Sequence, residues 1–221
     1  MQWLKKFFYL RFRTSFAKAG EDLQVFQLLK QKQNGQFVDI GSHHPIKGSN
    51  SFFFYLRGWS GICVDPNPDF KPLYQKLRPK DTFLNIGVSD QPGSLQYYKL
   101  KGNLSVMNSF SEDYIRKHIN PKDVDAIIPI EIKTLKEVFD KELNGKHIDF
   151  LTVDVEGLDL QVLKGNDWSR YRPSIICVES HGQLREDIQS ETTQYMLNQN
   201  YVLFAKAIQG DWVGTLFFKP L

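Results

Sequence analysis

The chain has 221 residues, of which 41% are hydrophobic and 24% are charged, and this is ordinary composition for one well-buried globular domain. The 28 basic and 25 acidic residues leave a net charge of +3. Such a balance argues against nucleic acid as a partner, because nucleic-acid-binding domains carry a strongly basic surface. The only cysteines, Cys63 and Cys177, each lie in an apolar run, which favours buried free thiols in a reducing compartment.

Residues 1–14 are aromatic and basic, and a single domain is expected over residues 15–221. Charged residues interrupt the apolar core that a signal peptide needs, and no run reaches the ~18 apolar residues of a membrane span. We expect this segment to be a helix that packs on its own domain. The alternative is an interfacial anchor on an anionic membrane. The expected location is therefore the cytoplasm, or the inner face of the membrane if the segment is an anchor.

The first half of the chain alternates helical patterns with short apolar runs. Helical spacing and helix-ending residues predict helices over residues 21–32, 51–57 and 69–77. Apolar runs that end in acids, glycine or proline predict strands over residues 36–41, 61–68 and 82–90. This alternation is typical of a parallel sheet with helices on its faces.

The middle of the chain has weaker patterns. Residues 91–100 begin with turn residues and continue as a strand or an extended arm, and residues 103–120 are expected to form a lid over the sheet edge. Residues 127–132 indicate a short edge strand. A helix is expected over residues 135–143, with Thr134 as its cap.

The last part of the chain returns to clear patterns. Strands are expected over residues 148–155 and 174–179, and helices over residues 158–164 and 191–198. A hairpin is expected from residues 201–206, a turn at 209–211 and residues 213–219. The prediction is an α/β three-layer sandwich with a seven-stranded, mostly parallel sheet and a C-terminal antiparallel hairpin. This combination is typical of the Rossmann-like fold of class I methyltransferases.

Two acids follow apolar runs at the ends of expected strands, Asp154 in DFLTVDVEG and Glu179 in SIICVESHG. If both runs are parallel strands, the carboxylates emerge side by side at the edge where open α/β sheets bind ligands. A carboxylate that ends a buried strand needs a partner, because its desolvation is costly. A ribose, a hydroxyl group and a divalent metal ion each supply such a partner.

Ordered motifs run through the chain from about residue 15 to the C-terminus. They include AGED (19–22), FVDIGSHHP (37–45), GWSGICVDPNP (58–68), NIGVSD (85–90), MNSF (107–110), IDFLTVDVEGLDLQVLKGNDW (148–168), RPSIICVE (172–179) and LFFK (216–219). In this order they resemble the FkbM family of S-adenosylmethionine-dependent methyltransferases. Two positions depart from the family pattern. Residues 17–18 read Ala-Lys instead of Ser-Gln, and residues 42–45 read Ser-His-His-Pro in place of a glycine-rich loop.

The resemblance implies S-adenosyl-L-methionine as the methyl donor. Gly41 supplies a tight turn that lets the backbone approach this donor. Asp39 is expected at the amino-acid end of the donor, or to orient the loop. Asp65 is expected to accept hydrogen bonds from the ribose hydroxyls, with a cap in its own turn as the alternative. The other residues expected to bind the donor are Glu21, Ser42, Ser49, Asn50, Pro66, Asn85, Gly87 and Asp154, and for those at helix starts capping is the alternative.

Four residues are expected on the acceptor side: Asp154, Glu156, Glu179 and His181. In one role, Asp154 or Glu156 is the general base for an acceptor hydroxyl. In a second role, Asp154 and Glu179 bind Mg²⁺ or another divalent cation, which lowers the pKa of the hydroxyl. In a third, Glu156 only caps the next helix. His181 is a candidate for orienting or deprotonating the substrate.

The sequence therefore predicts an O-methyltransferase. The resemblance implies a hydroxyl acceptor on a glycan, free or lipid-linked, or on a secondary-metabolite scaffold, so the expected process is polysaccharide modification. One alternative is a dinucleotide-dependent oxidoreductase, but residues 41–48 read GSHHPIKG where that class needs GxGxxG. The other is a non-catalytic cofactor-binding protein, which would be expected to lose its strand-end acids. The sequence leaves the oligomeric state open.

Overall fold

The computed structural model describes residues 14–221, so the helix and the membrane anchor expected near the N-terminus lie outside the described residues. Within that range, no helix combines the length and the apolar character that a membrane crossing needs.

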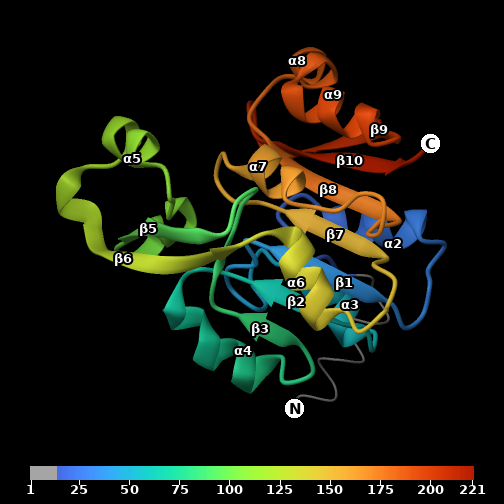
Figure 1. The fold of residues 1–221 in the computed structure, drawn as a ribbon, viewed down its shortest axis with the longest axis horizontal. Helices are drawn as coiled ribbons and strands as arrows, with labels where there is room; N and C mark the ends of the chain where they lie inside the picture. Colours follow the sequence, from blue (N-terminus) through green and yellow to red (C-terminus); the bar gives the residue numbers. More distant parts are fainter. Residues whose placement is uncertain (1–13) are drawn as a thin grey trace.

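A seven-stranded sheet forms the centre of the molecule (Figure 1). Its spatial order is β3 (Thr82–Leu84), β2 (Ser60–Val64), β1 (Gln36–Ile40), β7 (Phe150–Val153), β8 (Ile175–Ser180), β10 (Gly214–Pro220) and β9 (Tyr201–Ile208). The first five strands are parallel, and β10 runs antiparallel to both β8 and β9. The predicted mostly parallel sheet with a C-terminal antiparallel hairpin is confirmed.

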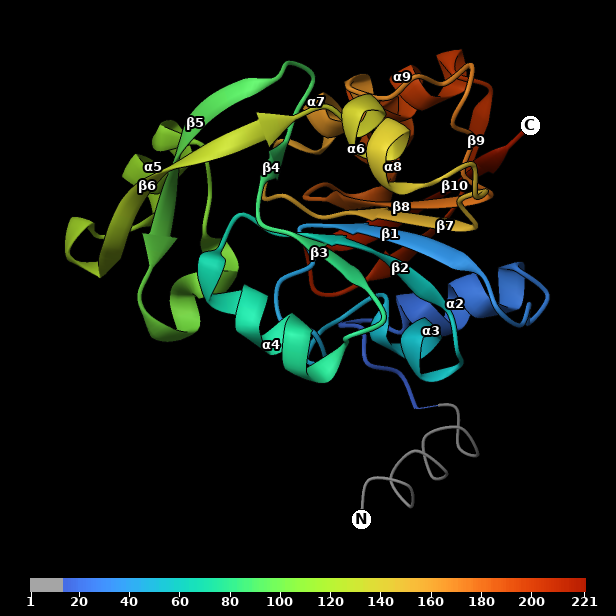
Figure 2. The same cartoon turned by 60° about the horizontal axis from the view of Figure 1, so that its bottom comes forward.

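Helices cover both faces of this sheet (Figure 2). Side chains alternate along β1, so Phe37 packs on one face while Val38 and Ile40 pack on the other. Helices α2 (Glu21–Leu28), α3 (Phe52–Leu56) and α4 (Lys71–Leu77) cover the Phe37 side. Helices α6 (Leu135–Glu142), α7 (Asp159–Lys164) and α9 (Glu191–Asn198) cover the Val38 side. The expected three-layer sandwich is confirmed.

Helix α8 (Leu184–Gln189) was not predicted. It has only six residues, and Leu184 and Ile188 are exposed, so it has no apolar face that a periodicity argument would detect. The capping box between Gln183 and Glu186 is the signal that the sequence offered.

A second sheet corrects two strand predictions. It has the order β4 (Gly87–Val88), β6 (Val124–Lys133) and β5 (Gly93–Leu100), so β6 is its central strand and not an edge strand. The strand expected over residues 82–90 is divided between the two sheets, because the chain turns at Asn85, whose amide donates to the Asp65 carbonyl at 2.9 Å.

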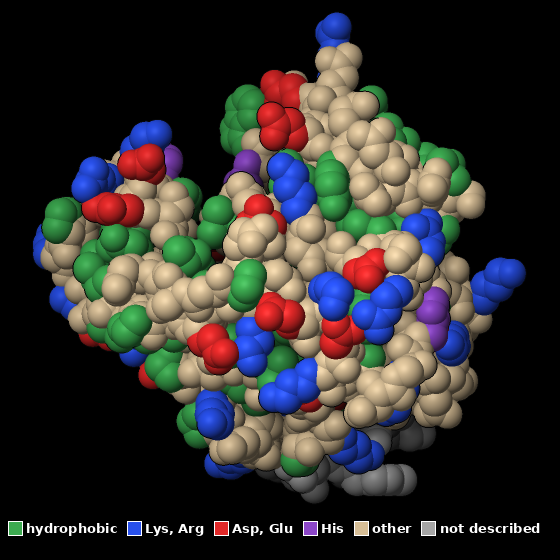
Figure 3. Space-filling model, viewed as in Figure 1, with side chains coloured by type: hydrophobic (Ala, Val, Ile, Leu, Met, Phe, Trp, Pro, Cys, Tyr) green, Lys and Arg blue, Asp and Glu red, His purple; other side chains and the backbone are tan. Residues whose placement is uncertain are grey.

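Strands β5 and β6, α5 (Glu112–His118) and the residues between them project from the body as one unit, which we call the arm (Figure 1). The lid expected over residues 103–120 belongs to this arm. The surface is hollowed between the arm and the rest of the molecule (Figure 3).

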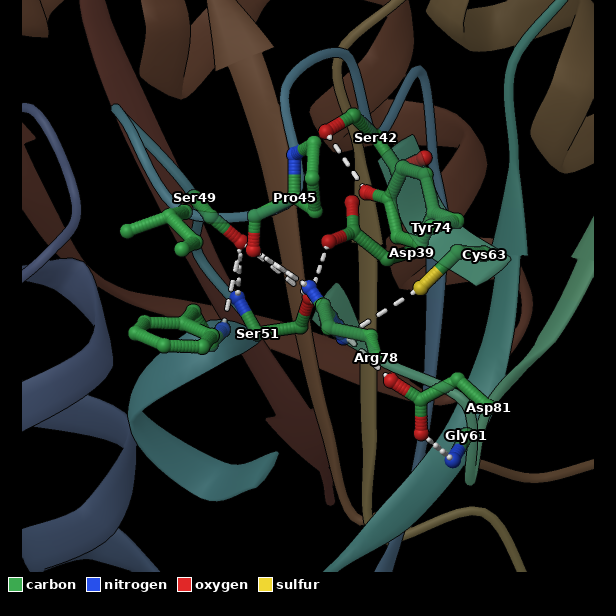
Figure 4. A network of polar contacts seen from close by, with 12 residues as sticks. Asp39, Ser42, Pro45, Ser49, Ser51, Gly61, Cys63, Tyr74, Arg78 and Asp81 are labelled. Carbon is green, nitrogen blue, oxygen red and sulfur yellow. Dashed lines mark hydrogen bonds and ion pairs between the residues drawn. The ribbon is translucent and has the colours of Figure 1, made fainter. Parts of the chain in front are cut away.

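A buried polar network fixes the loop that follows β1 (Figure 4). Arg78 is fully buried, and its Nε atom lies 2.7 Å from a carboxylate oxygen of Asp81. Its guanidinium also donates to the Pro45 carbonyl at 3.2 Å and to the Ser51 hydroxyl at 3.0 Å. The Ser51 hydroxyl in turn donates to the Asp39 carboxylate. One arginine therefore holds the ends of β1 and α4 and the start of α3 together.

Replacing Arg78 with methionine is expected to lower the free energy of unfolding by about 3–5 kcal/mol, because Asp81 stays buried without its cation. Chemical denaturation measures this change. The matched control is Arg116→Met, whose guanidinium pairs with Glu112 on the exposed surface of α5 and should cost less than about 1 kcal/mol. Similar losses in the two variants would contradict the structural role of the network.

Candidate active site

A cavity of about 370 Å³ opens at the carboxyl ends of β1, β2 and β7, and the arm forms its outer wall. Its volume falls in the range of small-molecule sites. We call it the main cavity. Predicted site residues along its wall are Asp39, Gly41, Ser42, Asn50, Asp65, Pro66, Gly87, Asp154 and Glu156. The arm contributes Tyr97, Ser105, Val106, Asn108, Ser109 and Phe110, so the predicted lid segment does border the sheet edge.

Gly41 brings the end of β1 into close contact with the end of β7. Its φ is +79°, and a Cβ atom there would lie 1.8 Å from the Asp154 carbonyl oxygen. The Gly41 and Ser42 amides donate to the Val64 carbonyl at 2.9 and 3.0 Å. A side chain is therefore excluded at this position both by conformation and by space. The bare backbone forms part of the cavity wall.

The Asp65 carboxylate lies at the end of β2 and holds two loops. Its Oδ2 accepts from the His43 amide and its Oδ1 from the Asn67 amide, both at 2.8 Å. Burial raises the pKa of Asp65 to about 7, although these two hydrogen bonds act in the opposite direction. Asp65 therefore holds its turn, but the cap of the short helix that follows is Asn67, whose side chain accepts from the Asp69 amide at 3.1 Å. Asp65 also lines the main cavity, where each carboxylate oxygen has a further lone pair.

Asp39 lies at the end of β1, where it joins the buried network to the main cavity. Its carboxylate accepts from Ser51, and burial raises its pKa to about 6. The residue also lines the main cavity. The hydrogen bond from Ser51 fits the expected orientation of the loop, and the place of Asp39 on the cavity wall allows the other expected role, contact with the amino-acid end of the donor.

Three residues expected to bind the donor are absent from the wall of the main cavity. The Glu21 carboxylate accepts from the Gln209 amide at 2.7 Å and from the Thr215 hydroxyl at 3.1 Å, so it ties α2 to the terminal hairpin. The Ser49 hydroxyl accepts from the Phe52 amide at 3.2 Å, which is the capping alternative. Asn85 is used in the turn between the two sheets. These three side chains therefore make structural contacts and do not line the main cavity.

Two buried polar atoms in the main cavity have no hydrogen-bond partner among residues 14–221. They are Ser42 Oγ and Asn108 Nδ2, and both residues line the cavity. Buried polar groups without partners are costly, so their presence here indicates a polar ligand. His43 adds an uncharged ring, because burial lowers its pKa to about 4.

The strand-end acids meet as expected at the edge of the sheet. Val153 and Val178 are partners in the register of β7 and β8, so Asp154 and Glu179 follow them on neighbouring strands. Asp154 lines the main cavity, whereas Glu179 and His181 line a second cavity of about 310 Å³ beside α7 and α8. Burial, with the charges of the neighbouring acids, raises the pKa of Glu179.

Glu156 does not cap the helix that follows it, so that alternative is wrong. Helix α7 has Leu158 at its cap position without a side-chain hydrogen bond, and Asp159 accepts from the Val155 amide at 3.2 Å instead. Glu156 has a φ of +53°, a strained conformation that is often found at functional sites. Burial, with a smaller effect of Asp154, raises its pKa to about 7.

Lys18 is a site residue that the motif analysis did not select. Its ammonium lies 3.7 Å from Asp154 Oδ2, and the residue lines the main cavity. The only signal in the sequence was its departure from the family pattern before Glu21. The place of the arm residues on the cavity wall was even harder to predict, because it depends on how the two sheets are arranged relative to each other.

Comparison with known proteins identifies the family. The model of the methyltransferase FkbM domain matches residues 39–203, about three quarters of the chain. The chain belongs to the FkbM methyltransferase family. The match includes Asp39, Asp65 and Asp154, which line the main cavity, and also Glu156 and Glu179. None of the curated proteins matches this FkbM chain in sequence.

Several solved methyltransferases are similar to this FkbM chain in structure. A 1,6-didemethyltoxoflavin-N1-methyltransferase from Burkholderia thailandensis, solved with S-adenosylhomocysteine, has a TM-score of 0.48 at 11% identity, covering 99% of this chain and 85% of its own. A TehB-like methyltransferase from Corynebacterium glutamicum has a TM-score of 0.46 at 10% identity, covering 91% and 88%. A precorrin-6y C5,15-methyltransferase from Geobacter metallireducens has a TM-score of 0.44 at 9% identity, covering 90% and 87%. The assignment rests on the family match and on the strand order.

Proposed function

We propose that the main cavity binds S-adenosyl-L-methionine and that the protein transfers its methyl group to a hydroxyl of a glycan or of a small-molecule scaffold. The observation that carries this proposal is the convergence of Asp39, Asp65 and Asp154 on one cavity in an FkbM methyltransferase chain. The two unpartnered polar atoms of Ser42 and Asn108 support a polar ligand in the same place.

On the donor side, the Asp65 carboxylate accepts hydrogen bonds from the ribose hydroxyls, and Asp39 faces the amino-acid end of the donor. The bare backbone at Gly41 permits close approach to the ligand. Asn108 Nδ2 and Ser42 Oγ provide further polar contacts. The donor supplies a methyl group on a positively charged sulfur atom.

On the acceptor side, Asp154 is the general base. The acceptor oxygen attacks the methyl carbon in line with the departing sulfur, which takes the electron pair of the broken carbon–sulfur bond. The hydroxyl proton goes to the Asp154 carboxylate, which lines the cavity beside Gly41. Lys18 forms an ion pair with the same carboxylate and keeps it oriented.

The acceptor enters through the hollow between the arm and the body (Figure 3). The second cavity, beside Glu179, offers further space for an acceptor. A cytoplasmic glycan, free or lipid-linked, fits these features. An oxidoreductase is disfavoured, because the loop after β1 has no GxGxxG and the family is one of methyltransferases.

The experiment is a labelled-methyl transfer assay with the full-length protein against extracted glycans and lipid-linked oligosaccharides. The proposal predicts label in an alkali-stable ether on the glycan fraction. Label only on amine or carboxyl products, with none on hydroxyls, would contradict the O-methyltransferase assignment.

Replacing Asp65 with asparagine is expected to weaken S-adenosylmethionine binding by roughly 10–100-fold, because one charge-assisted hydrogen-bond acceptor for the ribose is lost. Calorimetric titration gives the dissociation constants. The matched control is Asp113→Asn on the exposed surface of α5, which should bind the donor as the wild type does. Equal affinities in the wild type and Asp65→Asn would remove Asp65 from the ribose site.

A further inference from the structure

We propose that Glu156, Glu179 and His181 bind a divalent transition-metal ion such as Zn²⁺ at the boundary between the main cavity and the second cavity. The binding of the ion is a property of these three side chains. Its role in methyl transfer rests on the function proposed above.

The three side chains converge closely enough to hold one ion. A ligand atom from each of them lies within 4.8 Å of the other two. Ligands that bind one ion at about 2.0–2.2 Å lie about 3–4 Å apart, and His181 and Glu179 already meet this spacing at 3.8 Å. A small movement of the Glu156 side chain would complete the set. The distance of 3.8 Å between His181 Nε2 and Glu179 Oε2 is too long for a hydrogen bond but suits two ligands of the same ion.

An independent observation points to a ligand at this place. Among the residues that the structure describes, none is a hydrogen-bond partner of the buried Glu179 Oε2, and the Glu179 side chain is only 3% exposed. A buried carboxylate oxygen without a partner is strongly disfavoured. A cation between this oxygen and His181 removes that cost, since it replaces the lost hydration with direct coordination.

The backbone aims Glu156 at the same point. Glu156 and Gly157 both have positive φ, +53° and +93°, immediately after the end of β7. This strained turn puts Glu156 on the wall of the main cavity while its carboxylate still reaches Glu179 and His181. The ion therefore faces the place where acceptor and donor meet.

The ligand set differs from the pair that the sequence suggested. In one of the three roles considered for the strand-end acids, Asp154 and Glu179 share a cation. The converging group contains Glu156 and His181 with Glu179 and does not include Asp154. Asp154 instead pairs with Lys18. Asp154 therefore lies outside the ligand set of the ion and can accept a proton from the acceptor.

The donor atoms select the kind of ion. An imidazole nitrogen with two carboxylates favours Zn²⁺ and similar ions, whereas Mg²⁺ prefers oxygen ligands alone. Three protein ligands and one open position are typical of catalytic zinc sites. An acceptor hydroxyl in the open position would have its pKa lowered by the ion, and Asp154 would receive its proton.

The test is calorimetric titration of the full-length protein, first freed of metal with EDTA, with Zn²⁺ and separately with Mg²⁺. We expect one Zn²⁺ per chain and much weaker Mg²⁺ binding. Glu179→Gln and His181→Gln should each weaken Zn²⁺ binding by at least about 100-fold, because each removes a direct ligand of the ion. His118→Gln on the exposed end of α5 is the matched control and should bind as the wild type does.

Other results would overturn the proposal. These are the lack of saturable Zn²⁺ binding in protein that still binds S-adenosylmethionine, and equal losses in His181→Gln and His118→Gln. The two proposals fail separately, because donor binding is measured without the ion. A tight Zn²⁺ site in a protein that does not bind the methyl donor would keep the metal site and reject the proposed function.

Discussion

Replacing Gly41 with alanine is expected to lower the free energy of unfolding by more than about 4 kcal/mol, or to prevent folding altogether. The new Cβ would lie 1.8 Å from the Asp154 carbonyl oxygen. This oxygen belongs to the backbone at the end of β7, which cannot move aside as a flexible side chain could. The clash adds to the cost of about 1–2 kcal/mol that an alanine pays for a left-handed conformation. Chemical denaturation of the purified variant, or its failure to accumulate as folded protein, measures the effect.

The matched control for this substitution is Gly145→Ala. Gly145 has nearly the same φ, +77°, but a Cβ atom there would meet nothing within 4 Å. Its cost should therefore be the conformational part alone, about 1–2 kcal/mol. If Gly41→Ala proves no more destabilising than Gly145→Ala, the ends of β1 and β7 are not packed as tightly as the structure has them.

Replacing Asp154 with asparagine is expected to lower kcat by about 10²–10⁴-fold, the range that general-base catalysis contributes. Asparagine keeps the size of the side chain and a carbonyl oxygen at the cavity wall, so the donor should still bind with an affinity within a few-fold of wild type. The labelled-methyl assay gives the rate, and calorimetry gives the donor affinity.

The separation of these two readouts tests the role of Asp154. If Asp154 is the general base, Asp154→Asn should lower kcat strongly and leave donor binding nearly intact. A parallel loss in both would instead make Asp154 a donor-binding residue, the other role expected for it from the family resemblance. Asp113→Asn, on the exposed arm, controls for the removal of a carboxylate from the protein.

The main sheet could be predicted from the sequence because its central strands, β1, β2, β7 and β8, are buried on both faces. The runs that contain Val38, Ile62, Leu151 and Ile176 are almost wholly apolar, and each is followed by an acid or a glycine. The acids at the ends of these runs then predicted which edge of the sheet holds the site. That Asp39, Asp65 and Asp154 lie on one cavity follows from the parallel order of β2, β1 and β7.

The second sheet and the tasks of single polar residues were harder to predict. Asn85 ends β3 through one amide hydrogen bond to the backbone of Asp65, which no periodicity reveals. Glu21 was expected to bind the donor. Its hydrogen-bond partners in the structure include Gln209 and Thr215, which are almost 200 residues away in the sequence. Such partners depend on packing between distant elements, which a pattern of neighbouring residues does not contain.

The most direct test of the account is calorimetric titration of the folded, full-length protein with S-adenosylmethionine and, separately, with NAD⁺. The account predicts saturable binding of one S-adenosylmethionine per chain and no binding of NAD⁺, because the main cavity presents Asp65 and the bare Gly41 turn without a dinucleotide loop. Binding of NAD⁺ with no heat from the methyl donor would contradict it.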